Sequence, residues 1–213
     1  MLREDLIEDV FRRLEARAGP TRAQVKEDTD PFRALVSCLL SAQSLDVNTA
    51  RARDALFALA DTPRGILALP DAAVAAAIKP AGLYNIKTQR VKALCHTLIE
   101  ECAGVVPQDR AGLMKLPGIG RKCADITLLF TYGEPVIAVD THVHRVCNRT
   151  GLARGKTEAR TAQSLDDRAP AWAKRDGHVW LLEFGKRTCR SRKPRCETCF
   201  LNDLCEAWRQ GLV

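Results

Sequence analysis

Four cysteines close to the end of the chain have the spacing of a metal site. They follow the pattern C-x6-C-x2-C-x5-C and are Cys189, Cys196, Cys199 and Cys205. Thiolates are soft ligands, and four on so short a segment suit either a tetrahedral zinc ion or a 4Fe-4S cluster, between which spacing alone does not choose. Disulfides are less favoured, because the chain opens with charged residues and no apolar signal-peptide region. The sequence therefore predicts a metal site in a protein of the reducing cytoplasm.

Basic residues surround these cysteines: Lys186, Arg187, Arg190, Arg192, Lys193 and Arg195. The whole chain has a formal net charge of +7, and residues 1–30 contain six cations and eight anions, a net −2, so the remainder carries +9. Concentrated positive charge favours a nucleic acid over a membrane as the partner, and no apolar run approaches the ~20 residues that span a bilayer. We expect the metal to fold the loop and to direct four cations towards phosphates: Arg190, Arg192, Lys193 and Arg195.

A glycine-containing turn, Leu116-Pro-Gly-Ile-Gly120, precedes a predicted helix at 121–132. The glycines allow the chain to reverse tightly and then enter the helix, whose first backbone N–H groups lack partners and lie at the positive end of its dipole. Such groups bind phosphate oxygens without reading base sequence. A plain turn between two helices is the alternative interpretation. The motif predicts four nucleic-acid ligands: Leu116, Gly118, Gly120 and Arg121.

Lys122 and Asp140 are the candidate catalytic residues. A helix N-terminus and the neighbouring Arg121 disfavour an ammonium at Lys122, and burial would add to both effects, so a nucleophilic amine is one interpretation and a solvated or phosphate-binding lysine is the other. Asp140 stands before a predicted helix and suits an N-cap. A carboxylate held by amide donors can also face the positive charge that develops on a sugar.

The pattern of apolar residues predicts helices nearly everywhere. The first ends at Gly19-Pro20, and Asp30-Pro31 begins the second. Further helices are predicted at about 46–60, 71–79, 85–102, 109–115, 121–132, 141–149, 157–168 and 176–185, separated by breakers such as Thr62-Pro63. Only 135–139 is predicted to be extended, and one short strand cannot make a sheet. The predicted fold class is therefore all-α.

Several of these segments together resemble one family. LPGIGRKCADITLLFTYGEPVIAVDTHVHRVCNRTGL is similar to the helix-hairpin-helix and the following glycine-, proline- and aspartate-containing segment of the endonuclease III family of DNA glycosylases. LLSAQS, GLYNIK, RKPRC and the cysteine spacing also match that family, and the similarity extends from about residue 5 to 206. The resemblance favours a 4Fe-4S cluster over zinc.

The resemblance implies base-excision DNA repair by a bifunctional DNA glycosylase and AP lyase that removes oxidised pyrimidines from double-stranded DNA. Lys122 would attack C1′ of the damaged nucleotide, and the resulting Schiff base would undergo β-elimination. Asp140 would assist deprotonation of the lysine or stabilise the oxocarbenium character. Gln43 and Leu83 would fill the space of the extruded base, and His142 would lie near the DNA; from the residues alone, Gln43 is a polar helix residue, Leu83 belongs to the core, and a capping or core role suits His142 equally well.

The family fold would be two helical domains with a DNA cleft between them. A six-helix barrel domain with the helix-hairpin-helix would cover 24–134, and residues 1–23 and 135–213 would form a discontinuous iron-sulfur cluster domain. We expect a monomer in the cytoplasm, associated with the nucleoid.

Two departures from the family pattern qualify the resemblance. Cys123-Ala124-Asp125 stands where the family usually has Thr-Ala-Asn, and Phe184 stands where it often has histidine. Asp125 is on the same helix face as Lys122 and is expected to favour its ammonium form. An alternative function is therefore a DNA-binding relative that recognises abasic or distorted sites with weak or no excision. The remaining cysteines are interpreted as small hydrophobic residues: Cys38, Cys95, Cys102, Cys123 and Cys147.

Overall fold

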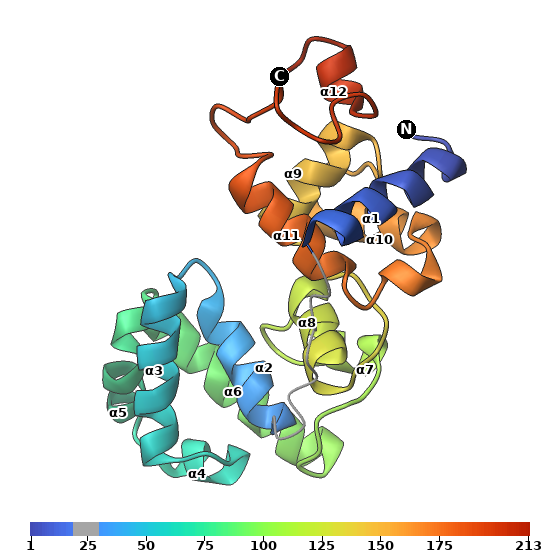
Figure 1. Cartoon of the computed structure of the whole chain (residues 1–213). Helices are drawn as coiled ribbons and strands as arrows, with labels where there is room; N and C mark the ends of the chain where they lie inside the picture. Colours follow the sequence, from blue (N-terminus) through green and yellow to red (C-terminus); the bar gives the residue numbers. More distant parts are fainter. Residues whose placement is uncertain (19–29) are drawn as a thin grey trace. The chain divides into compact units, whose positions relative to one another are not determined.

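A computed structural model describes residues 1–18 and 30–213, and within these ranges the chain is helical without strands. This confirms the predicted all-α class. The helices (Figure 1) are α1 (Glu4–Ala18), α2 (Pro31–Ser41), α3 (Asp46–Leu59), α4 (Pro63–Ala68), α5 (Asp71–Ile78), α6 (Tyr84–Cys102), α7 (Arg110–Lys115), α8 (Arg121–Thr131), α9 (Thr141–Thr150), α10 (Glu158–Arg168), α11 (Gly177–Arg187) and α12 (Glu206–Arg209), with short 3-10 turns η1 (Lys79–Ala81) and η2 (Ala171–Ala173). Among the described residues, none of these helices is long and apolar enough to cross a bilayer.

The chain divides into two compact units. The terminal unit consists of Met1–Gln24 and Gly133–Val213, and the central unit is Val25–Tyr132. The domain ranges expected from the sequence, 24–134 against 1–23 with 135–213, stay a prediction. Their boundary near residue 24 and the helix end expected at Gly19-Pro20 lie outside the described residues.

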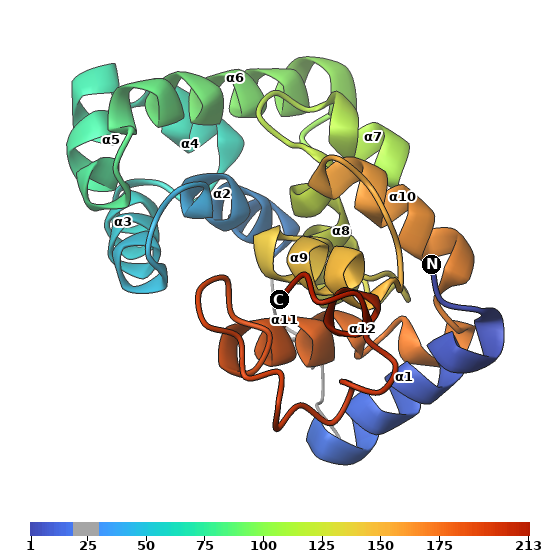
Figure 2. The ribbon, with the colours of Figure 1, turned by 90° about the horizontal axis from the view of Figure 1, so that it is seen from above.

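The central unit is built around α6, its longest helix, which packs against α2, α4 and α5 (Figure 2). Helix α8 packs against both α2 and α7. Lys87, Val91, Leu94 and Leu98 follow one another at helical spacing on the buried face of α6. This packing fixes the starts of α6 and α8 and the end of α2. The predicted site residues of this unit lie at these three places.

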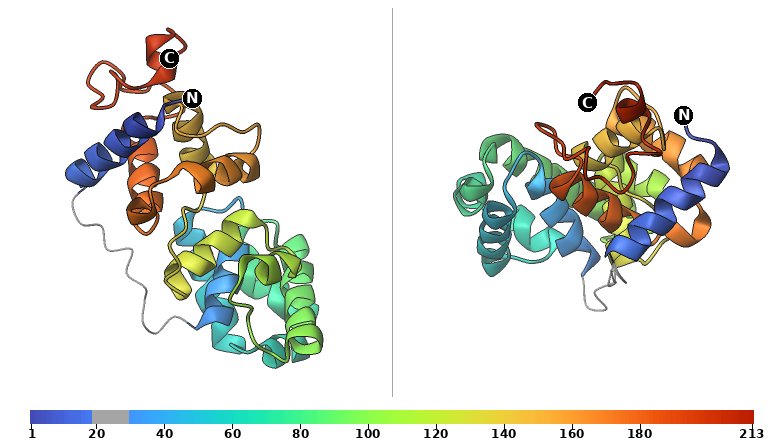
Figure 3. Two further views of the ribbon diagram at one scale, coloured as in Figure 1. Left: turned by 90° about the vertical axis from the view of Figure 1, so that its right-hand side faces the viewer. Right: turned by 45° about the horizontal axis from the view of Figure 1, so that its top comes forward.

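The terminal unit packs α1 against α11, and α9 against α10, α11 and α12 (Figures 1 and 2). Val10 and Phe11 of α1 are fully buried in its core together with Leu181 of α11. The N-terminal ammonium pairs with Glu206 of α12, so the two ends of the chain lie close together in this unit (Figure 3).

Local signals placed most elements correctly. The eight helices predicted between 46 and 185 are found within two residues at each end. Asp30 caps α2 as predicted, because its Oδ1 accepts a hydrogen bond of 3.0 Å from the backbone N–H of Arg33.

Helix α4 was missed, because Thr62-Pro63 was interpreted as a breaker. Instead Thr62 is the N-cap, with its Oγ1 accepting from the backbone N–H of Gly65 at 3.1 Å, and Pro63 opens the helix. Proline is favoured at the first helical position because no intrahelical partner is needed there. The segment 135–139 forms no strand within the described residues; Ile137, Ala138 and Val139 are buried in a connection between α8 and α9.

Candidate functional site

The turn before α8 forms a tight hairpin with α7. Gly118 has φ +79°, a left-handed conformation that favours glycine. A Cβ at this position would also approach Leu39 Cδ1 to 3.2 Å and Arg90 Cδ to 3.4 Å. Gly120 is the N-cap of α8, and no side chain caps this helix. The first N–H groups of α8 can therefore bind an anion, whereas the side chain of Leu116 is buried and only its backbone could contribute.

Lys122 lies in the first turn of α8, and its side chain is exposed within the central unit. The sequence left open whether Lys122 is buried, and within this unit it is not. Exposure leaves Nζ accessible to a sugar carbon, as nucleophilic attack requires.

The carboxylate of Asp125 pairs with two arginines. It is fully buried, with Oδ1 2.7 Å from Nε of Arg110 and Oδ2 2.7 Å from Nε of Arg121. Both oxygens are thus bonded to guanidinium groups, one from α7 and one from α8. The expected influence of Asp125 on Lys122 stays a prediction; what the structure shows is that this acid joins the two helices of the hairpin. The side chain of Arg121, predicted to bind DNA, is only 12% exposed and has its Nε directed to Asp125.

Gln43 and Leu83 both adopt a left-handed backbone conformation, with φ of +52° and +49°. Such values are uncommon for residues other than glycine and persist where the surrounding structure enforces them. Gln43 follows the end of α2 and is exposed, so its interpretation as a helix residue was wrong. Leu83 precedes α6 and is 52% exposed, so it is not a core residue. Both positions present their side chains to solvent from the central unit.

Lys87 was missed by sequence analysis. Its side chain is buried, and Nζ donates hydrogen bonds of 2.8 Å to the carbonyl oxygens of Leu40 and Ala81. Leu40 is three residues before Gln43, and Ala81 is two residues before Leu83. Burial, and then the charge of Arg90, lowers the pKa of Lys87. The signal that could have identified Lys87 is its position, because it is the last residue of GLYNIK and lies among the apolar residues on the buried face of α6.

Asp140 caps α9 in the terminal unit, as predicted. Its Oδ1 accepts hydrogen bonds from the backbone N–H groups of His142 at 2.9 Å and Val143 at 2.8 Å. His142 is partly buried, and its Nδ1 lies 3.2 Å from a guanidinium nitrogen of Arg145. Its Cβ lies 3.1 Å from where a Cβ on Gly185 would stand, so a larger residue on α11 would displace it.

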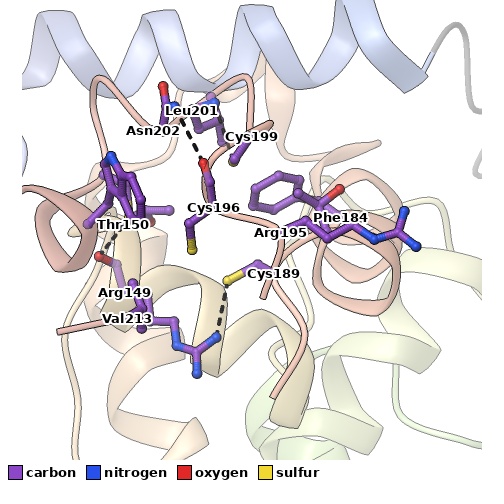
Figure 4. Close-up of a pocket in the computed structure, with 13 residues that line it drawn as sticks. Arg149, Thr150, Phe184, Cys189, Arg195, Cys196, Cys199, Leu201, Asn202 and Val213 are labelled. Carbon is purple, nitrogen blue, oxygen red and sulfur yellow. Dashed lines mark hydrogen bonds between the residues drawn. The ribbon is translucent and has the colours of Figure 1, made fainter. Parts of the chain in front are cut away.

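The four predicted metal-binding cysteines line one cavity, together with Phe184, Leu201 and Trp208, and Cys189 and Cys196 direct their sulfur atoms into it (Figure 4). In the described part of the chain, no three His, Cys, Asp or Glu side chains are arranged around a single ion. Four thiols that line one cavity fit a 4Fe-4S cluster, in which each iron takes one cysteine. The residues present therefore fit this group.

Two arginines of α9 hold the cysteine loop, and neither was predicted. Arg145 donates to the carbonyl oxygens of Cys189 and Gly185, both at 2.9 Å. Arg149 donates to the carbonyl oxygen of Arg190 at 2.7 Å, and its guanidinium lies 3.7 Å from Sγ of Cys189 (Figure 4). Hydrogen bonds and positive charge near ligand sulfurs stabilise the thiolates and tune the cluster. The loop leaves its four predicted phosphate ligands exposed: Arg190, Arg192, Lys193 and Arg195.

Loss of one cluster ligand should unfold this loop. Replacing Cys199 by serine removes one thiolate, and we expect both the visible absorbance that zinc lacks and the protection of 189–205 from proteolysis to be lost. Cys147 is buried in α9 outside the cavity, so Cys147→Ser is the control and should keep the absorbance. Unchanged absorbance in Cys199→Ser would contradict the assigned ligand set.

Comparisons with known proteins agree with this arrangement. Residues 36–171 match the model of the HhH-GPD superfamily base excision DNA repair protein, and residues 189–205 match the iron-sulfur binding domain of endonuclease III. Endonuclease III of Escherichia coli (strain K12) is 46% identical over 178 residues, 84% of each chain. Two solved structures superpose with a TM-score of 0.88 at 31% identity: a non-covalent endonuclease III–DNA complex and a trapped endonuclease III–DNA covalent intermediate. Each match covers 100% of this chain. It covers 99% of the chain in the non-covalent complex and 100% of the chain in the covalent intermediate.

Proposed function

Because the chain belongs to the endonuclease III family of the HhH-GPD superfamily, we propose that Lys122 and Asp140 are its catalytic residues. The protein is a DNA glycosylase and AP lyase of base-excision repair that binds DNA, removes oxidised pyrimidines through a lysine Schiff base and β-elimination, and contains a 4Fe-4S cluster. The observation that supports the role of Lys122 most directly is its exposed amine in the first turn of α8. No side chain caps this helix, which directly follows the hairpin turn.

The lysine performs the covalent step. The lone pair of Lys122 Nζ forms a bond to C1′ of the damaged nucleotide, and the bond from C1′ to the base breaks with the base as leaving group. Ring opening gives the Schiff base; loss of a proton from C2′ then expels the 3′ phosphate and cleaves the strand. Asp140 accepts both of its backbone hydrogen bonds at Oδ1, so we assign Oδ2 to take a proton from the amine or to stabilise positive charge on the sugar.

The DNA contacts divide into positioning and base-replacement groups. The backbone around Gly118, Gly120 and Arg121, with a backbone contribution from Leu116, binds phosphate at the start of α8, and the exposed loop cations bind further phosphates. Gln43 and Leu83 occupy the space that the extruded base leaves, and His142 lies near the DNA. Extruding a nucleotide costs a few kcal/mol, least for a poorly stacked lesion, so selection of damaged bases begins before the chemistry. The protein acts as a monomer on nucleoid DNA in the cytoplasm.

Lys87 is a positioning residue for this base-replacement pair. Its ammonium joins the carbonyl groups of Leu40 and Ala81 and so fixes the two turns that hold Gln43 and Leu83 in their left-handed conformations. One buried group thereby sets the separation between two exposed side chains that act on the same base pair.

Replacing Lys87 by methionine should lower excision from duplex DNA by about tenfold or more while costing about 1–3 kcal/mol of stability, because two buried carbonyls lose their donor. Strand cleavage of an abasic-site duplex, which contains no base to be extruded at the lesion, should fall much less. Because burial lowers the pKa of Lys87 in the folded protein, wild-type stability should also rise with pH towards the ordinary lysine value of 10.5, and the variant should lose this dependence. Lys92→Met is the control, because Lys92 Nζ also donates to a carbonyl, that of Leu69 at 2.6 Å, but away from both turns.

Borohydride trapping tests the proposed function. The protein is incubated with a thymine-glycol duplex and borohydride, which reduces the Schiff base to a stable adduct, and the modified residue is identified by peptide mapping. An adduct on Lys122 with strand cleavage supports the proposal. Binding of the duplex without adduct or cleavage would instead favour the alternative, a relative that recognises distorted DNA without efficient excision. Asp125, the residue that suggested this alternative, is bonded to two arginines.

A further inference from the structure

Two thiols outside the cluster lie against each other in the central unit. Sγ of Cys38 in α2 is 2.9 Å from Sγ of Cys123 in α8, although the residues are 85 positions apart. Helices α2 and α8 lie side by side (Figure 1). Both cysteines were interpreted from the sequence as small hydrophobic residues, but Cys123 directly follows Lys122 and is partly exposed.

The two thiols differ in reactivity. The hydrogen bond from Cys38, followed by the charge of Lys122, lowers the pKa of Cys123 against the effect of burial. The same hydrogen bond, together with burial, raises the pKa of Cys38. Cys123 is thus the accessible thiol that becomes a thiolate more readily, and Cys38 is its buried neighbour. Two other cysteines contrast with this pair: burial raises the pKa of both Cys95 and Cys147 to about 12.

We propose that Cys38 and Cys123 are an oxidative modification site, which a low-molecular-weight disulfide such as glutathione disulfide converts to an intramolecular disulfide. The Cys123 thiolate attacks one sulfur of that disulfide and expels one glutathione thiolate. Cys38 then loses its proton and attacks Sγ of Cys123, expelling the second glutathione. The two protein thiols lose two electrons and two protons, and one glutathione disulfide is reduced to two thiols.

The new bond affects the helix that carries the nucleophile. Bond formation requires the sulfur atoms to approach to about 2.05 Å with a Cβ–S–S–Cβ dihedral near 90°. We expect this approach to draw the first turn of α8 towards α2. Lys122 precedes Cys123 in that turn, and its amine moves with the backbone. This consequence rests on the proposed role of Lys122: the oxidised protein forms the Schiff base several-fold more slowly, and a reductant restores the rate.

Peptide mapping of the intact holoenzyme tests the modification itself. After treatment with glutathione disulfide and digestion with trypsin without reductant, Cys38 lies in peptide 34–51 and Cys123 in peptide 123–145, each with no other cysteine. We expect one species in which these peptides are joined, separated again by dithiothreitol. In Cys38→Ser, Cys123 should accumulate as the mixed disulfide with glutathione, because the resolving thiol is missing. Recovery of wild-type Cys123 only as a free thiol or as the mixed disulfide would overturn the proposal.

Single-turnover trapping tests the consequence, with the visible absorbance of the cluster monitored so that cluster loss is not mistaken for inhibition. The oxidised wild type should be several-fold slower than the reduced protein, whereas Cys123→Ser should respond little to the oxidant. An oxidised wild type of full rate would show that α8 tolerates the bond and would overturn the coupling to Lys122. The mapping result does not require Lys122 to be catalytic, so failure of the proposed nucleophile and failure of the thiol pair give different outcomes.

Discussion

Lys122→Ala should abolish the borohydride adduct and reduce single-turnover base excision and strand cleavage by at least about 10³-fold, more than about 4 kcal/mol of transition-state stabilisation. The physical reason is that alanine has no lone pair that can form the bond to C1′, so neither the Schiff base nor the elimination that depends on it can occur. Because Lys122 is exposed, the substitution leaves no cavity, and the fold should be unchanged. The measurement is trapping and product formation on a thymine-glycol duplex.

Lys115→Ala is the matched control for this variant. Lys115 is also an exposed lysine next to the hairpin, at the end of α7. Removing one cation should weaken DNA binding slightly and reduce its dependence on salt, without loss of the adduct. Lys122→Ala should keep duplex binding, which separates a loss of chemistry from a loss of affinity. An adduct of normal yield in Lys122→Ala would assign the nucleophile to another amine.

Asp125→Asn should destabilise the protein by about 3–5 kcal/mol, because removing one member of a buried ionic group leaves its partners uncompensated. Asparagine keeps the shape of the side chain but not the charge, so Arg110 and Arg121 would share a neutral amide in place of a carboxylate. The loss should be seen as a lower urea midpoint and melting temperature. At a temperature where the variant is folded, the trapping rate should be close to that of the wild type.

Asp109→Asn is the control for Asp125→Asn. Asp109 is the N-cap of α7, directly before Arg110, and its Oδ1 accepts a hydrogen bond from the backbone N–H of Gly112 at 2.8 Å. Asparagine is an equally good N-cap, so stability should hardly change. If Asp125→Asn were instead as stable as the wild type and formed the Schiff base faster, the carboxylate would act on Lys122, as its position in the sequence first indicated.

The amino-acid sequence by itself determined the helical architecture and predicted which cysteines bind the metal. Helix positions follow from apolar spacing and from caps such as Asp30 and Asp140, which act over three or four residues. The cysteine ligands lie on one short segment, so their spacing restricts the site before the chain folds. Thr62-Pro63 was one local failure, since the same residues that end one helix can begin another.

The partners of the polar side chains were decided only by the tertiary structure. Asp125 is near Lys122 in the sequence, but the packing of α7 against α8 brings Arg110 to its carboxylate. Lys87 bonds to a carbonyl 47 residues away, and Cys38 meets a thiol 85 residues away. Helical spacing places residues on one face, whereas a buried charge or thiol interacts with whichever groups the neighbouring helices bring within a few ångströms, and no local pattern encodes that distance.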